Sequence, residues 1–210
     1  MAIGLLGLVA PGANAAADTV VSTPAYTWHG DTVTQGPFKA YAPSGHEIVS
    51  DYSAQPGYYM GIDKVWKLKN DISAYPKLVT PGRLYEAVYN MGLDEMVNAV
   101  EPDTTLRTGK EWAGVWTRDV SYSILLSMAY MQPEASMISL MKKVDPLGRV
   151  IQDTGSGGAW PVSTDREIWC VAAWEVYKVT GSREWLEFIY PVMKRSLETD
   201  AKAFYGTETG

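Results

Sequence analysis

Two short acidic segments carry the residues whose types and spacing could do chemistry. The first is the run Trp116-Thr117-Arg118-Asp119, at the head of an apolar periodic segment. A helix N-terminus has unpaired N–H groups and a partial positive charge, so a plain helix cap would also explain Asp119. Arg118 adds a fork of donors beside this acceptor, and Trp116 adds a flat apolar face. A guanidinium and a carboxylate together can hold neighbouring sugar hydroxyls from both the donor and the acceptor side.

The second segment begins at Asp165, after a glycine-rich loop that contains Trp160. An acid at this position also favours the helix dipole, so a structural and a binding interpretation remain open for Asp165. Trp169 follows one turn later and repeats the pairing of an acid with an aromatic side chain. If the two helix N-termini open on the same side, they form a polar cleft floored by tryptophan, as expected for a carbohydrate site.

The loop before Asp165 is long for a compact domain, and loops of this length usually have a function or are disordered. It is not a phosphate-binding loop, because no Gly-Lys-Ser/Thr sequence follows its glycines. We expect the glycines to bring the backbone close to some other group.

The composition narrows the classes of partner. The 210 residues are 46% hydrophobic and only 20% charged, which predicts a globular chain. A net charge of −6 without any Lys/Arg run gives no electrostatic basis for binding nucleic acid or an anionic membrane. Eight Trp and thirteen Tyr against three Phe suit a sugar ligand, although large helical proteins also bury many such side chains.

Cysteine and histidine are too scarce for several common kinds of site. Cys170 is the single cysteine, so neither an internal disulfide nor a thiolate metal site can form. His29 and His46 lie early in the chain, far in sequence from the acidic segments, which leaves little for a Ser-His-Asp triad. We therefore expect no metal and no cofactor.

The chain falls into three predicted regions. Residues 1–17 resemble a signal peptide, with a short apolar run before Pro11-Gly12 and then Ala13-Asn14-Ala15. The run is too short to span a bilayer, so we expect export, to a bacterial periplasm or outside the cell, and no membrane span. Residues 18–75 read as an extended lead-in with a few strands. Residues 76–210 read as mostly helical.

Helical spacing and breaker residues predict about five helices in the last region. Pro133 should stop one helix and start the next, Gly181 should end another, and Pro191 should kink the one after it. Thr164 and Glu167 have the spacing of a capping box. The predicted helices are 83–99 (one helix, or two divided near Gly92), 117–131, 133–144, 164–181, and one that follows a Ser182 cap.

A family resemblance rests on these same residues. The run from Gly114 to Asp119, followed by an apolar helix, resembles the Trp-x-Arg-Asp motif of six-hairpin glycosidases. These include glucoamylases, processing α-glucosidases and glycogen-debranching amylo-α-1,6-glucosidases. The segment from Ser163 to Trp169, leading to Gly181 and a Trp-containing partner helix, is similar to the next helical hairpin of those enzymes. The similarity covers about residues 81–204.

The resemblance implies an (α/α)6 toroid of twelve helices, of which this chain would supply about five after a β-containing N-terminal segment. It implies that Arg118 and Asp119 bind the sugar without transferring a proton, with Asp165 as a weaker candidate for the same pocket. Trp116 and Trp160 complete the predicted substrate-binding set. The acid and base of such enzymes usually come from later helices, so the catalytic residues remain unknown and we expect a fragment with exposed apolar faces.

Three functions follow from this interpretation. The first is an exported glycoside hydrolase, expected to invert configuration, that acts on an oligo- or polysaccharide. The second is a sugar epimerase, isomerase or lyase, because α/α toroids host those chemistries too. The third is a non-catalytic carbohydrate-binding protein, for which the aromatic side chains alone would suffice. The sequence leaves the sugar, the linkage and the stereochemical outcome open.

Overall fold

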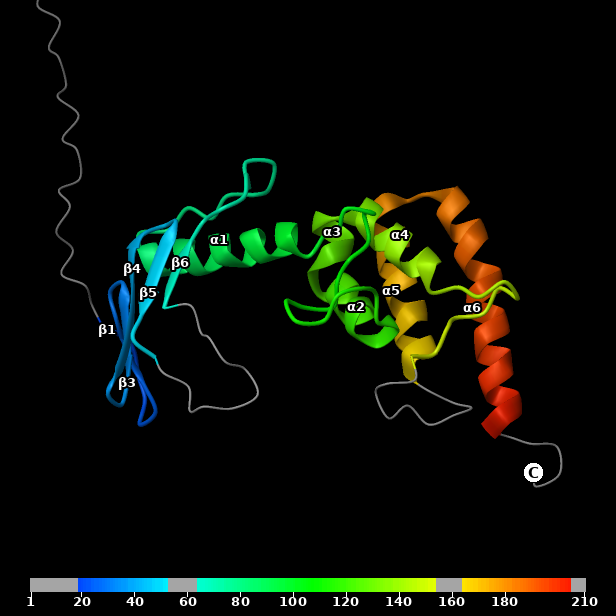
Figure 1. Cartoon of the computed structure of the whole chain (residues 1–210), viewed down its shortest axis with the longest axis horizontal. Helices are drawn as coiled ribbons and strands as arrows, with labels where there is room; N and C mark the ends of the chain where they lie inside the picture. The colour runs from blue at the N-terminus through cyan, green and yellow to red at the C-terminus, as the bar shows by residue number, and fades with distance from the viewer. Residues whose placement is uncertain (1–18, 53–63, 154–163, 205–210) are drawn as a thin grey trace, which may run out of the picture. The chain divides into compact units, whose positions relative to one another are not determined.

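The computed structural model describes residues 19–52, 64–153 and 164–204, and the chain divides into two compact units (Figure 1). Unit 1 is Met1–Asp94 and unit 2 is Glu95–Gly210. Helix α1 (Arg83–Asn98) contains the division, which falls between Asp94 and Glu95. The predicted signal peptide and Trp160 lie outside the described residues.

Unit 1 contains a six-stranded antiparallel sheet in which each strand pairs with its sequence neighbours, in the order β1 to β6. Gly30 and Gly36, with φ of 55° and 56°, form the turns on either side of β3, where a left-handed backbone favours glycine. The strands are β1 (Thr19–Ser22), β2 (Thr27–His29), β3 (Thr32–Gln35), β4 (Phe38–Ser44), β5 (Glu47–Ser50) and β6 (Val65–Lys67). The sequence predicted only an irregular lead-in with a few strands, so it underestimated this sheet.

Helix α1 packs on one face of the sheet. Leu84 and Ala87 of α1 meet Ala42 of β4 in a small buried core, and apolar side chains of four strands pack against it. The strand residues are Trp28, Val33, Ile48 and Trp66. The helix is continuous through Gly92, although a glycine costs about 1 kcal/mol relative to alanine inside a helix. We attribute the continuity to buried side chains on both sides of Gly92.

Unit 2 contains the other helices of the described chain. They are α2 (Thr117–Ser123), the π-helical segment η1 (Ile124–Met128), α3 (Ala129–Met131), α4 (Pro133–Lys142), α5 (Thr164–Thr180) and α6 (Arg183–Phe204). The first three follow one another without a gap and together match the predicted helix 117–131. In η1 the Ala129 N–H donates to the Ile124 carbonyl, five residues back. The predicted helices 83–99, 133–144 and 164–181 are confirmed, and each observed end lies within two residues of the predicted one. The helix predicted after the Ser182 cap begins at Arg183.

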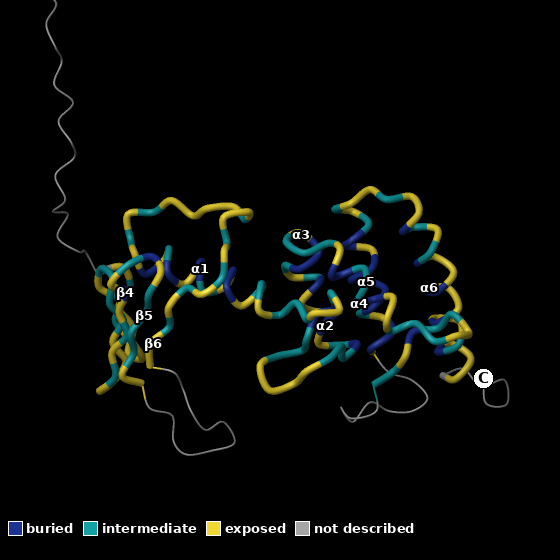
Figure 2. The backbone as a smooth tube through the Cα atoms, turned by 45° about the horizontal axis from the view of Figure 1, so that its top comes forward, coloured by how far each residue is buried: buried dark blue, intermediate teal, exposed yellow. Residues whose placement is uncertain are grey.

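The core of unit 2 is built around α5, which contacts α2, α4 and α6. The inward faces of these helices appear as the dark blue segments of Figure 2. The largest fully buried side chain in this core is Trp169, and its indole N–H donates to the Leu140 carbonyl at 3.0 Å. The indole N–H of Trp185 likewise donates to the Ala173 carbonyl at 2.9 Å. Each tryptophan thus buries its apolar rings and satisfies its single donor.

A two-residue connection joins α5 and α6 in a helical hairpin, as predicted. Gly181 has a φ of 61°, which suits the residue after a helix C-terminus, and its N–H donates to the Tyr177 carbonyl. Ser182 Oγ accepts the Trp185 N–H at 3.1 Å, which confirms the predicted cap. Helix α6 continues through Pro191. Within the described ranges, no helix combines the length and the apolar character needed to cross a bilayer.

Candidate functional site

An ion pair joins the first turns of α2 and α5. Arg118 donates to one oxygen of Asp165, Oδ1, from Nε at 2.9 Å and from Nη2 at 2.8 Å. The Asp165 side chain is fully buried, whereas 34% of the Arg118 side-chain surface stays exposed. The two segments identified from the sequence therefore meet, with the cation at the surface and the carboxylate beneath it.

Asp153 extends this pair into a largely buried network, in which its own side chain is 16% exposed. Its backbone N–H donates to the second oxygen of Asp165, Oδ2, at 3.1 Å. Its own carboxylate accepts the Thr117 N–H and lies 2.6 Å from Lys143 Nζ. Thr117 Oγ1 donates to the Ile151 carbonyl at 2.9 Å, which adds a second link between α2 and the chain before the glycine-rich loop. The beginning of α2 is thus held by the strand-like segment that precedes that loop.

Asp153 and Lys143 are the members of the network that the sequence did not identify. Both lie at element ends or in a connection, where no periodic pattern marks a residue. The one signal that could have pointed to Asp153 is its position as the last acidic residue before the glycine-rich loop. Sequence alone does not say which helix terminus such a residue would cap.

Asp119 is exposed in the first turn of α2. No side chain caps the N-terminus from Trp116, and the Thr117 N–H goes to Asp153 instead. Within the part of the chain that the structure describes, the Asp119 carboxylate has no hydrogen-bond or ion-pair partner. A helix-capping role is therefore filled by Asp153, and the Asp119 oxygens are open to a ligand.

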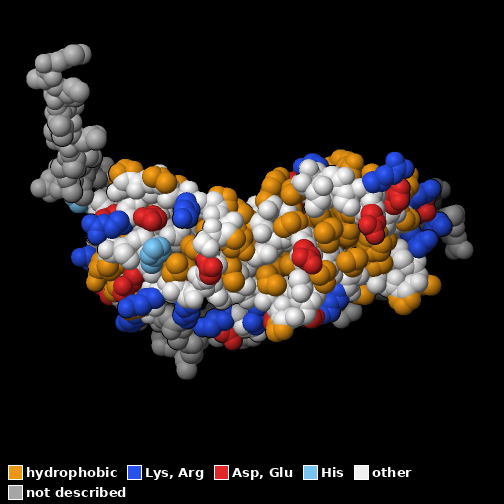
Figure 3. Space-filling model, turned by 90° about the horizontal axis from the view of Figure 1, so that it is seen from above, with side chains coloured by type: hydrophobic (Ala, Val, Ile, Leu, Met, Phe, Trp, Pro, Cys, Tyr) orange, Lys and Arg blue, Asp and Glu red, His pale blue; other side chains and the backbone are white. Residues whose placement is uncertain are grey.

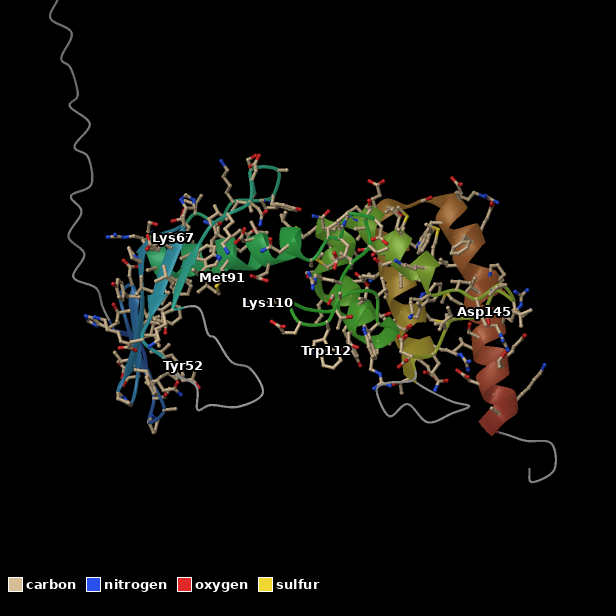
Figure 4. The ribbon with its side chains drawn as sticks, viewed as in Figure 1. Tyr52, Lys67, Met91, Lys110, Trp112 and Asp145 are labelled. Carbon is tan, nitrogen blue, oxygen red and sulfur yellow. The ribbon has the colours of Figure 1, made fainter. Side chains whose placement is uncertain are left out.

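Two tryptophans precede α2. The rings of Trp112 and Trp116 meet edge to face, with centroids 5.9 Å apart and an interplanar angle of 86°. Trp116 is half-buried, and its backbone N–H donates to Thr108 Oγ1 at 3.3 Å. Trp112 is 45% exposed. Trp112 is labelled in Figure 4, on the loop that leads into α2. The sequence did not single out Trp112, although an aromatic ring four residues before Trp116 was visible.

Asp165 and Trp169 are both fully buried, so neither can contact a sugar at the surface. Trp169 belongs to the core and does not floor a cleft, because none of its surface is exposed. Thr164 is the first residue of α5, and within the described residues no hydrogen bond links it to Glu167 in a capping box. Asp165 has both oxygens bonded and no exposed surface, which suits a residue that positions Arg118.

The remaining candidate chemistry in unit 2 is limited. Burial raises the pKa of the Cys170 thiol to about 12, and the nearby carboxylates Glu167 and Asp200 add to the shift, so this thiol is not a nucleophile near neutral pH. No group of three or more His, Cys, Asp and Glu side chains within the described ranges is arranged to hold a metal ion. His29 and His46 both belong to unit 1.

Several large apolar side chains of unit 2 are exposed. They follow the outer faces of α2 to α3 and of α5, and include Tyr122, Leu126, Tyr130, Val171 and Trp174. Hydrophobic side chains are also visible on the surface in Figure 3. Exposed apolar surface of this kind is typical of proteins that bind ligands or other proteins there.

Comparisons with protein-family models, with curated proteins and with solved structures found no match to this chain.

Proposed function

We propose that unit 2 binds carbohydrate through Arg118 and Asp119, with Trp116 and Trp112 providing apolar contact, and that it does so as part of an exported glycoside hydrolase. One observation carries this proposal. A fully buried carboxylate holds the Arg118 guanidinium through two hydrogen bonds, while the neighbouring Asp119 carboxylate is exposed and has no partner among the described residues.

The geometry supports binding because the donor is held in place before a ligand arrives. Both Arg118 bonds go to Asp165, whose position is fixed in turn by the Asp153 N–H. An arginine held in this way loses less side-chain freedom on binding, and less of the interaction energy is then used for ordering. Asp165 is accordingly a positioning residue in this proposal, and the sugar contacts belong to Arg118 and Asp119.

The neighbouring residues provide the complementary chemistry. A sugar hydroxyl both donates and accepts, so adjacent hydroxyls can accept from the guanidinium and donate to the Asp119 carboxylate. Indole faces bury the C–H face of a sugar ring, and Trp112 and Trp116 lie in the segment immediately before Arg118. We further propose that the helices of unit 2 represent part of an α/α toroid.

Hydrolysis needs more than this site. Two carboxylates must flank the glycosidic bond, one as acid and the other as base or nucleophile, and Asp165 is unsuited to either role because it is buried and paired. The proposal therefore assigns no acid or base. A non-catalytic carbohydrate-binding protein would use the same four side chains, and sugar release separates the two functions.

The test is a calorimetric titration of the full chain with neutral malto-oligosaccharides. Arg118→Lys should weaken binding by about tenfold, because an ammonium ion cannot bond Asp165 through two parallel donors and also hold a fixed donor toward the sugar. Asp119→Asn should weaken it less, since the amide still offers one acceptor. Arg183→Lys on α6 is the matched control and should leave binding unchanged, because Arg183 pairs with Glu187 on an exposed helix face and with no other side chain of the described residues.

The proposed site is wrong if the chain binds no saccharide, or if Arg118→Lys and Arg183→Lys bind with the same affinity as the unmodified chain. Sugar release from the same oligosaccharides, measured by product chromatography, tests the hydrolase part separately. Binding without release would support the non-catalytic alternative.

A further inference from the structure

Unit 1 contains a cavity of about 460 Å³ that no part of the proposed function uses. It lies between α1, the turn that joins β4 and β5, and the segment that leads from β6 to α1. Figure 1 shows that segment as the loop beside α1. A cavity of this size is in the range that holds small organic ligands.

The segment over this cavity is held by hydrogen bonds to two residues of α1, Asp94 and Tyr89. Asp94 accepts the Asn70 N–H at 3.0 Å, Asn70 Nδ2 at 2.7 Å and the Trp66 indole N–H at 3.1 Å. Burial opposes ionisation of Asp94, but these hydrogen bonds outweigh it and lower the pKa of its carboxyl. Further along the loop, the Tyr89 hydroxyl donates to the Pro76 carbonyl at 2.7 Å. The cavity wall is therefore fixed in place without a ligand.

Glu86 of α1 lines the cavity in an unusual position. A Cβ atom built on Gly45 would lie 2.4 Å from the Glu86 carboxyl carbon, so a side chain at position 45 would displace this carboxylate, which is the flexible end of Glu86. Gly45 is buried, and its carbonyl accepts Asn90 Nδ2 at 2.9 Å. Among the described residues, Glu86 is half-buried and has neither a hydrogen-bond nor an ion-pair partner.

Asn90 lies one helical turn after Glu86 and lines the same cavity. Its Nδ2 is engaged by the Gly45 carbonyl, which directs Oδ1 elsewhere, and within the described ranges Oδ1 accepts no hydrogen bond. Two acceptors on one face of α1 therefore lack donors. The other lining residues that can carry charge, His46, Asp71 and Lys77, are all exposed, so Glu86 sets the charge of the deeper part.

The rest of the lining is largely apolar, and includes Leu68, Ile72 and Leu93. We propose that this cavity binds an organic ammonium ion, a primary amine on an apolar body, with Glu86 and Asn90 accepting its N–H groups. An ammonium ion supplies three donors and a positive charge, and an apolar body fills the space between the leucine and isoleucine side chains. A structural role for Glu86 in the first turn of α1 would need only an exposed acid, whereas Glu86 is half-buried and lines the cavity.

A matched set of ligands tests the proposal by calorimetry on the full chain at pH 7. Cyclohexylamine, cyclohexanol and cyclohexanecarboxylate share one body and differ in the charge and donors of the polar group. We expect cyclohexylamine to bind, cyclohexanol to bind at least about tenfold more weakly, and cyclohexanecarboxylate not to bind. Equal affinity for the amine and the alcohol, or no binding of the amine at millimolar concentration, would overturn the proposal.

Two variants locate the binding site. Glu86→Gln should weaken cyclohexylamine binding by about tenfold or more, since it removes the charge from the acceptor. Glu95→Gln makes the same change on the exposed side of the same helix and should bind like the unmodified chain. Gly45→Ala should also weaken binding, because the methyl group displaces the Glu86 carboxylate. Circular dichroism verifies that each variant is folded, and unchanged affinity in both folded cavity variants refutes the assignment. Saccharide binding by unit 2 is measured independently, so either proposal can fail alone.

Discussion

The pairing of Arg118 with Asp165 predicts a strong energetic coupling between the first turns of α2 and α5. A double-mutant cycle with Arg118→Ala, Asp165→Asn and the double variant measures it. Two charge-assisted hydrogen bonds, at 2.8 and 2.9 Å, would each contribute about 1.5–3 kcal/mol if both partners were buried. Because 34% of the Arg118 side-chain surface is exposed, solvent screening lowers this value, and we expect a coupling of about 2 kcal/mol for the pair.

The two single variants should differ in cost. Arg118→Ala removes the cationic partner of a buried carboxylate, to which the Asp153 N–H still donates, and a buried charge that has lost its counter-ion is strongly unfavourable. Asp165→Asn leaves the guanidinium at the surface, where water can solvate it, and preserves the side-chain shape. Arg118→Ala should therefore lower the free energy of unfolding by more than Asp165→Asn does.

Urea unfolding followed by tryptophan fluorescence gives the free energies, and hydrogen exchange of the Trp169 indole N–H reports on unit 2 alone, because that group is bonded inside its core. The matched control is the same cycle at Arg183 and Glu187, a pair whose side chains are 89% and 65% exposed, for which we expect a coupling close to the measurement error. If the Arg118–Asp165 coupling does not exceed that of the control, the site is not held as described.

Three further outcomes follow from individual side chains. The pKa of Asp94 lies below the usual 3.8, so its carboxylate stabilises the fold above that value and the contribution is lost as the pH falls through the folded-state pKa. The stability difference between the unmodified chain and Asp94→Asn, from urea unfolding, should thus be largest near neutral pH and shrink below about pH 4. Ile189→Ala, at a fully buried position, should lower the free energy of unfolding by about 2–5 kcal/mol, and a loss under 1 kcal/mol would show a poorly packed core. Cys170 should resist iodoacetamide at pH 8 in the native chain and react in urea, since burial raises its pKa to about 12.

The helices of unit 2 could be predicted because their signals are local. Pro133 and Gly181 mark helix boundaries through backbone geometry alone, and the Ser182 cap needs only the N–H of Trp185. Apolar spacing along each segment then identifies the buried face, as it does for Ile124 on η1 and Ile189 on α6. Such features depend on residues a few positions apart, which a sequence displays directly.

The sheet was harder to predict because its strands are short and its pairing is not visible within any one strand. β2 and β6 have three residues each, too few to establish an alternating pattern, and turn residues interrupt the region throughout. Burial in this sheet also depends on α1, which follows it in the sequence. The apolar strand residues become informative only when that helix is placed against them.

The candidate site shows the same limit. The sequence placed Arg118 and Asp165 in the first turns of two helices, as the structure does, but it could not show that one oxygen of Asp165 accepts two hydrogen bonds from Arg118. Whether an acid at a helix start is a ligand, a cap or a counter-ion depends on groups supplied from elsewhere, here by Asp153. That information is tertiary and has no local pattern.

The π-helical segment η1 bears on how the helix that begins at Thr117 could accept a change in length. A π turn contains one residue more than the α turn it replaces, so it can be regarded as a single-residue insertion that the helix has absorbed. Removing that residue, for instance the exposed Leu126, would restore a regular α-helix and leave the residues after it on nearly the same faces relative to Arg118, because the π turn has already taken up the extra residue. Tyr130 would then stay beside Glu175, which its hydroxyl contacts at 2.5 Å. A single-residue deletion elsewhere in a regular helix would turn the following side chains by about 100°, so this turn is a place where the helix tolerates a change in length.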